Sequence, residues 1–382
     1  MKRIKLWALL AVVAMVLAAC TTAADTTTTG ATDPAAPGTT APDDGGTTTP
    51  PAPEPPAGGV LAAVQDRGVL NCGVNNAVPG FGSVDADGVP VGFDIDFCKA
   101  VAAAVLDDPE AVEYVALTAQ QRFTALQSGE IDVLIRNTTF TSSRDGTEGS
   151  TFLTTTFYDG QGMMVTADSG FTSIDDMTDT SICVLSGTTT ELNLTTRMTG
   201  INYEPLTFED NEQLQAAFVA GQCDGWTSDK SQLAGVRSAW PADAGGPEAL
   251  VILEETFSKE PLGPVVLDGD SQWAQIVDWV IIATIAAEEL GIDSTNLDSF
   301  ADTENADIRR LLGLEITTDA GTAPFDPGLG LATDFAAKVI AAVGNYGEIY
   351  DRNVGPGTPL GLDRGVNALW TEGGLMYAPP YR

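Results

Sequence analysis

Hydrophobic residues beyond residue 60 of the chain fall into two kinds of pattern, short continuous runs and longer stretches with helical spacing. Residues 69–74 form a short apolar run that is typical of a buried strand. Residues 93–106 place Phe97, Val101 and Val105 at intervals of four, which predicts a helix with one face packed on a core. The ordered part of the chain is therefore expected to begin with a strand and a helix.

Two later segments each consist of a predicted helix, a glycine that ends it, and a predicted strand. They are the helix 121–127 with Gly129 and the strand 131–135, and the helix 213–220 with Gly221 and the strand 223–226. A further apolar strand, 182–185, precedes the second segment. Residues 125–132 (ALQSGEID) and 217–224 (AFVAGQCD) align position by position, so the two halves repeat one arrangement. The repeat predicts two α/β lobes with largely parallel sheets, with a ligand crevice between them at the carboxyl ends of the strands.

Polar residues directly follow three of these strands. The strand of the first repeat is followed by hydroxyl side chains, a predicted helix start and Arg144, whose guanidinium can hold a carboxylate through two hydrogen bonds. The next strand is followed by Thr188 and Glu191 at the spacing of a capping box, which turns backbone amides toward the loop. The last strand is followed by Asp229, a carboxylate suited to an ammonium group. An α-amino-acid zwitterion requires both kinds of partner.

Each of these residues also has a purely structural interpretation. Arg144 fits an exposed helix start, and Thr188 fits a helix cap with no further role. Asp229 next to Lys230 fits a solvated ion pair. The ligand-site interpretation is favoured because all three loops occupy equivalent positions in a repeated framework.

The N-terminus has the pattern of an export signal, which we assign to residues 1–19. Three basic residues precede an apolar run, 6–16, that is too short to cross a bilayer as a helix. The run ends in LAAC (17–20), which resembles the bacterial lipobox and predicts that Cys20 becomes lipidated after cleavage. The alternative is an ordinary signal peptide that leaves Cys20 as an unmodified thiol.

Residues 20–59 are rich in Thr, Ala, Pro, Gly and Asp and contain almost no large apolar side chain. Such a segment cannot bury enough surface to offset its conformational entropy. We therefore expect a disordered tether between a lipid anchor and the two lobes.

Composition excludes several function classes. The chain contains no histidine, which removes Ser-His-Asp and Cys-His catalysis and every imidazole metal site. Its 18 Lys and Arg residues stand against 53 Asp and Glu residues, and the net charge of -35 excludes nucleic acid as a partner. We expect no metal and no cofactor.

Four cysteines remain beyond Cys20, and they admit three pairings. They are Cys72, Cys98, Cys183 and Cys223. Pairing in sequence order is favoured because each bridge then joins elements of the same half. Free buried thiols and a metal site are the alternatives, and the lack of CxxC and of histidine disfavours a metal.

Several stretches between residue 60 and the C-terminus carry a family resemblance. They are LNCGVNNAVPGFG, GFDIDFCKAVAAAVL, RFTALQSGEIDVLIRNTTFTSSRD, FYDGQGMMV, SGTTTELNL, SKEPLGPVV, AVGNYGEIYDRNVGPGTPL and NALWTEGGLMYAPPYR. With them the chain resembles the substrate-binding component of an ABC transporter for polar or general L-amino acids, and the last two resemble the C-terminal extension of the general amino-acid branch. The resemblance implies a type II periplasmic-binding-protein fold, with two α/β lobes, two crossover strands and a helical C-terminal extension. It also implies a receptor that closes on its ligand and delivers it to a permease.

The resemblance assigns the carboxylate end of the ligand to Arg144. Thr139 and the backbone amides around Thr188 and Thr189 are implied to assist it.

The ammonium end is assigned, again by resemblance, to Asp229, with a backbone carbonyl from Asn137. Asn75 and Phe81, in the loop after the first strand, are implied to shape the side-chain end. Many relatives have an acidic residue where Asn75 stands, so a neutral amide here leaves the side-chain preference open.

Domain boundaries follow from the same resemblance. The crossovers are expected near 157–162 and 259–263. Lobe 1 then comprises 60–157 and 264–382, and lobe 2 comprises 158–263.

The apolar segment 273–290 is predicted to be a packed helix and not a membrane span, because it contains Asp278 and a polar start. With the export signal, this places the protein outside the cytoplasm, held to the cell membrane through its lipid alone.

Two other functions fit the same fold. A periplasmic dehydratase would need an Asp or Glu with a shifted pKa as its acid or base, since no histidine is present. A ligand-sensing module for a signalling partner would normally be fused to a transmembrane helix. A binding protein without enzymatic activity is the favoured interpretation.

Overall fold

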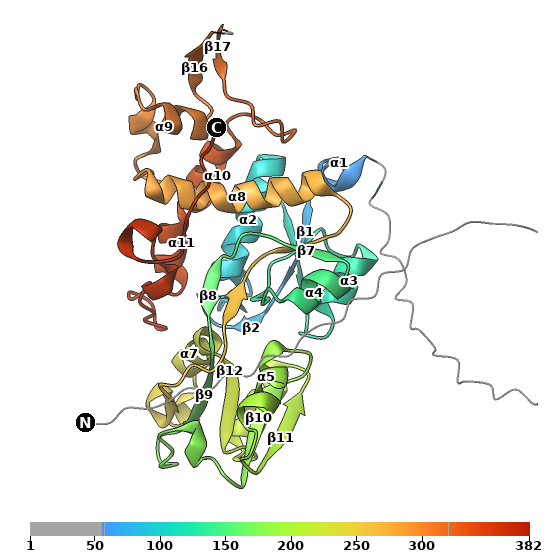
Figure 1. Ribbon diagram of the computed structural model, residues 1–382, viewed down its shortest axis with the longest axis vertical. Coiled ribbons are helices and arrows are strands. Elements are labelled where there is room, and N and C mark those ends of the chain that lie inside the picture. The colour runs from blue at the N-terminus through green and yellow to red at the C-terminus, as the bar shows by residue number, and fades with distance from the viewer. Residues whose placement is uncertain (1–55, 57, 320) are drawn as a thin grey trace, which may run out of the picture. The chain divides into compact units, whose positions relative to one another are not determined.

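The computed structural model describes residues 56, 58–319 and 321–382, which form two lobes that are each built on a five-stranded sheet (Figure 1). The two-lobed α/β architecture expected from the repeat is confirmed. The predicted signal peptide, Cys20 and nearly all of the predicted tether lie outside the described residues.

The first sheet has the strand order β5-β1-β6-β15-β7. Its strands are β1 (Leu70–Val74), β5 (Val112–Ala116), β6 (Val133–Leu134), β7 (Ser150–Phe152) and β15 (Val265–Leu267). Strand β1 is parallel to β5 and β6, whereas β15 is antiparallel to β6 and β7. The carboxyl ends of β1, β5 and β6 therefore share one edge of the sheet. Strand β6 is shorter than the predicted strand 131–135, although Ile135 N still donates to Gly73 O at 2.9 Å and keeps the chain extended there.

The second sheet has the strand order β11-β10-β12-β9-β13. Its strands are β9 (Gln161–Thr166), β10 (Thr180–Leu185), β11 (Tyr203–Phe208), β12 (Gly225–Asp229) and β13 (Leu250–Ile252). Strand β10 is parallel to β11 and β12, and β9 is antiparallel to β12 and β13. The predicted strand 223–226 is therefore wrong at both ends. Antiparallel pairing with β9 continues as far as Asp229 opposite Gln161, so Asp229 is the last residue of the strand and does not follow it.

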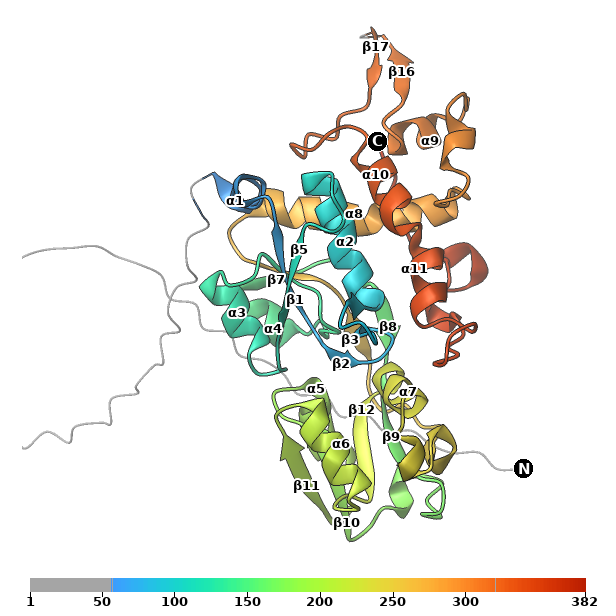
Figure 2. The same cartoon turned by 180° about the vertical axis from the view of Figure 1, so that it is seen from behind.

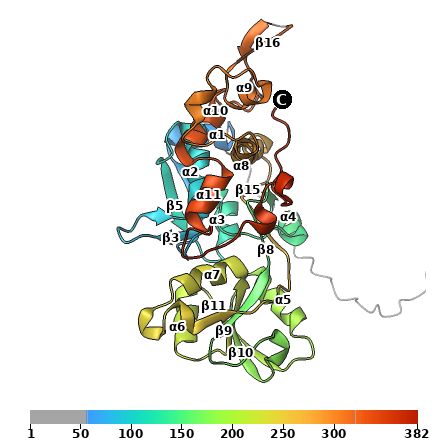
Figure 3. The ribbon, with the colours of Figure 1, turned by 90° about the vertical axis from the view of Figure 1, so that its left-hand side faces the viewer.

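Two short strands connect the two sheets. Strand β8 (Phe157–Asp159) leads into β9, and β14 (Glu260–Leu262) leads back toward β15 (Figures 1 and 3). They pair antiparallel with each other, with Asp159 opposite Glu260. The remaining strands form a small three-stranded sheet and a hairpin, namely β2 (Ala77–Val78), β3 (Gly82–Val84) and β4 (Pro90–Val91), and β16 (Glu315–Thr318) and β17 (Gly321–Pro324).

Helices pack against both sheets (Figures 1 and 2). They are α1 (Gly59–Arg67), α2 (Phe93–Leu106), α3 (Arg122–Ser128), α4 (Ser142–Thr147), α5 (Thr189–Arg197), α6 (Asn211–Val219), α7 (Lys230–Ser238), α8 (Ser271–Glu289), α9 (Ala306–Leu311), α10 (Phe335–Val343) and α11 (Tyr346–Asn353). The prediction for 93–106 is confirmed at both ends. Gly92 precedes this helix at φ 137°, where a side chain would run into the backbone of Phe81, so only glycine fits the start of α2.

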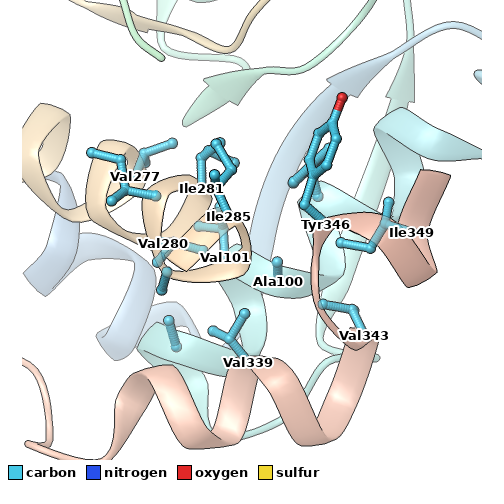
Figure 4. Close-up of a cluster of buried hydrophobic side chains, with 14 of the residues drawn as sticks. Ala100, Val101, Val277, Val280, Ile281, Ile285, Val339, Val343, Tyr346 and Ile349 are labelled. Carbon is cyan, nitrogen blue, oxygen red and sulfur yellow. The ribbon is translucent and has the colours of Figure 1, made fainter. Parts of the chain in front are cut away.

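The C-terminal extension is part of the core of the first lobe. Side chains from α2, α8, α10 and α11 form one buried cluster, which includes Val101, Ile281, Val339 and Tyr346 (Figure 4). Helix α8 buries most of its length, as predicted for a packed helix. None of the helices in the described part of the chain is both long and apolar enough to cross a bilayer.

One disulfide lies in each lobe. Cys72 of β1 is bonded to Cys98 of α2, and Cys183 of β10 is bonded to Cys223, just before β12. This is the pairing in sequence order that the sequence favoured. Each bridge joins a central strand to a neighbouring element of the same lobe.

Candidate ligand-binding site

A small cavity lies where the two lobes meet, at the carboxyl ends of β6, β10 and β12. Its volume is about 20 Å³. Its lining from the first lobe consists of Ala119, Arg122, Arg136, Asn137, Thr139 and Arg144, and its lining from the second consists of Leu185, Thr188, Thr189, Thr190, Ser228, Asp229 and Gln232. The structure thus brings together most of the residues that the sequence singled out. We call this the inner cavity.

Three hydrogen bonds join the lobes around the inner cavity. They run between the hydroxyls of Thr139 and Thr189 at 3.3 Å, from Arg122 Nη2 to Gly187 O at 3.3 Å, and from Asn137 Nδ2 to Gln232 Oε1 at 3.2 Å. The lobes are therefore in direct contact at the site.

Arg144 lies in the first turn of α4. Thr141 caps this helix by accepting a hydrogen bond from Arg144 N at 3.2 Å. The guanidinium donates through Nη1 to Thr139 O at 2.9 Å and lies over the Phe123 ring. Burial lowers the pKa of Arg144, and it forms no ion pair with any carboxylate of the described residues. Its other N–H groups are free to hold an anion. Arg144 is buried, so the alternative that it is only an exposed residue at a helix start is wrong.

Thr188 caps α5, and Thr189 begins that helix. The Thr188 hydroxyl accepts from Glu191 N at 3.1 Å, as the capping pattern predicts. The Glu191 carboxylate, however, accepts from Gly187 N at 2.9 Å and not from the capping residue, so only half of the predicted capping box forms. Thr189 donates to Glu260 Oε2 at 2.7 Å, which ties the start of the helix to the connecting strand β14.

Asp229 is buried at the end of β12, and its Oδ1 has no hydrogen-bond partner in the described structure. Burial raises the pKa of its carboxyl well above the usual range, and nearby Asp159 and Glu260 raise it further. The expected alternative, a solvated pair with Lys230, does not form, because Lys230 Nζ donates to Glu254 O and Thr256 Oγ1. An unpaired buried carboxylate beside a cavity is suited to a cationic ligand group.

Asn137 links the site to the core of the first lobe. Its φ of 29° is rare for a side-chain residue, and its N–H donates to Asp94 Oδ2 at 2.8 Å. Its side-chain oxygen accepts from Asn75 Nδ2 at 3.3 Å, and its side-chain nitrogen donates across the cleft to Gln232 Oε1. Burial raises the pKa of Asp94 to about 7.

A second cavity, of about 230 Å³, adjoins the first. Arg136 and Leu185 line both cavities, and Asn75 lines the second. We call this the outer cavity. Phe81, which was expected near Asn75, lines neither of them; its ring is buried against Phe157 at a centroid distance of 5.1 Å.

The sequence interpretation missed Arg122, Arg136 and Gln232. Arg136 directly follows the predicted strand 131–135, so the search for polar residues after strand ends that identified Arg144 could also have identified Arg136. Arg122 and Gln232 lie in the first turns of α3 and α7, where an amphipathic pattern alone does not separate a site residue from a surface residue.

Two further carboxylates stand next to the site on the connecting strands, Asp159, which is partly buried, and Glu260, which is buried. Asp159 accepts from Gly160 N and Ser231 N, and burial raises its pKa to about 6. Glu260 is held by Thr189 and by Asn193 Nδ2 at 2.9 Å. Among the described residues no cluster of acidic or cysteine side chains has an arrangement that could hold a metal ion. A buried arginine without an ion-pair partner and a buried carboxylate with an unpaired oxygen, Arg144 and Asp229, thus line the same cavity.

Sequence and structure comparisons find close similarity to known proteins. Residues 70–355 match the pattern of the bacterial extracellular solute-binding proteins, family 3. The chain is 49% identical over 324 residues to the general L-amino acid-binding periplasmic protein AapJ of Rhizobium johnstonii, a match that covers 84% of this chain and 92% of the relative. It is 50% identical over 322 residues to the glutamate/glutamine/aspartate/asparagine-binding protein BztA of Rhodobacter capsulatus, with the same coverage. A periplasmic binding protein from Brucella ovis, solved with glutathione bound, has a TM-score of 0.79 and 46% identity over 84% of this chain and 99% of its own.

Proposed function

The chain belongs to family 3 of the bacterial extracellular solute-binding proteins, and from this membership we propose that it captures L-amino acids between its lobes and delivers them to the permease of an ABC transporter. One observation carries the assignment to α-amino acids. An arginine without a carboxylate partner, Arg144, and a carboxylate with an unpaired oxygen, Asp229, line the same small cavity. These are the two charges that a zwitterion needs.

In this proposal Arg144 binds the α-carboxylate, with Thr139 and the backbone amides of Thr188 and Thr189 as further donors. A guanidinium in a buried site binds a carboxylate strongly because water does not compete.

Asp229 binds the α-ammonium in the same proposal, with Asn137 contributing its backbone carbonyl. The ligand side chain then points toward the outer cavity and Asn75. Phe81 supports this loop from the core and does not touch the ligand.

Binding is coupled to closure of the two lobes. We take 60–157 and 264–382 as lobe 1 and 158–263 as lobe 2, with β8 and β14 as the connections. A ligand that contacts both lobes binds the closed arrangement better than the open one, and so shifts the population toward it.

The protein acts outside the cytoplasm, as its family does. We further propose that residues 1–19 are removed on export, that Cys20 carries the lipid anchor, and that 20–59 is the tether. Mass spectrometry of the protein from the native host tests the anchor, since an unmodified Cys20 would contradict it.

The binding proposal is tested by thermal unfolding with each of the twenty L-amino acids, followed by calorimetry. A ligand that binds only the folded protein raises the unfolding midpoint. Arg144→Ala should abolish the shift, while Arg352→Ala, an arginine paired with Asp96 away from the cleft, should not change it. No shift with any amino acid would reject the proposal. Recovery of a chemically altered ligand after incubation would favour the dehydratase alternative.

A further inference from the structure

The cleft contains three buried arginines, and the proposed α-amino-acid ligand binds only one of them through its α-carboxylate. Arg122, Arg136 and Arg144 all line the inner cavity. None of the three forms an ion pair with a carboxylate of the described residues. After an α-amino acid has bound to Arg144 and Asp229, two guanidiniums still lack an anionic partner.

Arg122 has a role in the contact between the lobes. Its Nη2 donates across the cleft to Gly187 O, and its Nε is buried without a partner. It does not line the outer cavity. Arg122 is therefore near the proposed position of the ligand's α-amino and α-carboxyl groups and not near the outer cavity, where the ligand side chain is proposed to lie.

Arg136 is placed differently, because it lines both cavities. Its Nε donates to Leu117 O at 2.7 Å, which fixes the plane of the guanidinium. Its Nη atoms donate to no acceptor of the described residues, although the side chain is only 5% exposed. A buried cation with free donors thus stands at the junction through which a ligand side chain must pass.

The charge of Arg136 is only partly balanced by the protein. Asp94 is the carboxylate that acts on it most strongly, but Asp94 Oδ2 already accepts a hydrogen bond from Asn137 N, and burial raises the pKa of Asp94 to about 7. Burial lowers the pKa of Arg136 to about 10, so it stays cationic at neutral pH. A buried cation is costly unless a partner is supplied.

We propose that Arg136 binds a second carboxylate on the ligand, so that the site prefers the dicarboxylic amino acids L-glutamate and L-aspartate over their amides. The proposal rests on the proposed function, since it presumes that Arg144 and Asp229 hold the α-amino-acid head group. The neutral Asn75, which lines the outer cavity together with Arg136, supports it, because an acidic residue there would weaken the attraction for a carboxylate.

Acidic residues on the rim of the outer cavity limit the length of the ligand. Glu209 and Glu212 are exposed, and water and salt screen them from the buried guanidinium. Asp210 is occupied as the cap of α6, where it accepts from Gln213 N at 2.8 Å. A carboxylate that reaches Arg136 is attracted, whereas a longer acidic side chain meets these residues. L-α-aminoadipate should therefore bind less tightly than L-glutamate.

The test is calorimetric titration of the purified protein with L-glutamate and L-glutamine, which have nearly the same shape and differ in charge. The native protein should bind glutamate at least about 10-fold more tightly. Arg136→Gln should weaken glutamate binding about 10- to 100-fold and change glutamine binding less than about 3-fold. Arg136→Lys should recover part of the glutamate affinity, and Arg352→Gln, the matched control, should change neither ligand.

The outcomes separate this proposal from the one on which it rests. Glutamine binding as tight as glutamate binding in the native protein overturns the role of Arg136 and leaves the amino-acid receptor intact. An equal loss of both ligands in Arg136→Gln, with unchanged unfolding of the ligand-free protein, also overturns it, because the residue would then only support the cleft. Failure of the native protein to bind any amino acid rejects the proposed function itself.

Discussion

One glycine of the second lobe lies in close contact with the backbone of the first, and we predict that closure depends on it. Gly235, in helix α7 of the second lobe, faces Pro79 of the first. A Cβ at this position would lie well under 3.0 Å from Pro79 O, and Pro79 C would be 3.3 Å away. The obstacle is backbone and cannot rotate aside. Gly235→Ala should therefore block the last part of closure.

The expected loss of ligand affinity follows from the free-energy cost of overpacking, which is about 1–3 kcal/mol for one added methyl group. If that cost falls on the closed state alone, amino-acid affinity drops about 5- to 150-fold. The ligand-free protein should not lose stability, because separated lobes relieve the contact and alanine is favoured over glycine inside a helix by about 1 kcal/mol.

Calorimetry gives the affinity, thermal unfolding gives the stability without ligand, and small-angle scattering gives the compaction on binding. Gly357→Ala is the matched control, since a Cβ there would meet no atom within 4 Å. Unchanged affinity together with unchanged compaction would refute the reasoning. A lowered midpoint without ligand would show that the damage is to α7 itself.

Three other perturbations test the electrostatics, the connecting strand and a disulfide. Burial beside Asp159 and Glu260 raises the pKa of Asp229 in the folded protein, so its carboxyl holds a proton that the unfolded chain loses near pH 4. Ligand-free stability should therefore fall as the pH rises above about 4, until Asp229 ionises in the folded protein as well. Ligand affinity should rise over the same range, and calorimetry in buffers of different ionisation enthalpy should detect proton release on binding. Flat profiles would contradict this. Asn367→Ala removes two hydrogen bonds to the backbone of Tyr158 in β8, at 2.6 and 3.0 Å, and should cost about 1–3 kcal/mol in denaturant unfolding; no change would mean that β8 needs no support from the extension. Replacing Cys183 and Cys223 by serine, which opens a loop with a sequence separation of 40, should cost about 4 kcal/mol, and an unchanged denaturation midpoint would refute the entropic account.

Ligands of α/β sheets bind at the carboxyl ends of the parallel strands, which explains why some residues of the candidate site could be predicted from the sequence. Arg144 follows β6 of the first sheet and Asp229 ends β12 of the second, and the carboxyl ends of the parallel strands of both sheets lie at the same cavity. The helix at 93–106 was predictable because its limits are set locally, by Gly92 before it and by Asp107 at φ 58° after it.

Other features depend on partners that are distant in sequence. Strand β12 reaches Asp229 only because β9 pairs with it antiparallel, which no local pattern indicates. Phe81 turns into the core because Phe93 and Phe157 pack against its ring there. The burial of Arg122 likewise requires the second lobe, since Gly187 accepts its hydrogen bond.

The position of Asp229, the proposed ammonium acceptor, gives a physical reason for coupling between binding and closure. Asp229 lies near Asp159 and Glu260, which are opposite each other on the two connecting strands, and the charges of these two carboxylates add to the burial that raises the pKa of Asp229. A ligand ammonium at Asp229 offsets that repulsion, and it does so most where water is excluded, in the closed arrangement. Glu260 also holds Thr189, whose hydroxyl meets Thr139 across the cleft. In this proposal the cation-binding group and the two connecting strands therefore belong to one electrostatic network, and a neutral ligand of the same shape should close the lobes less completely than a zwitterion.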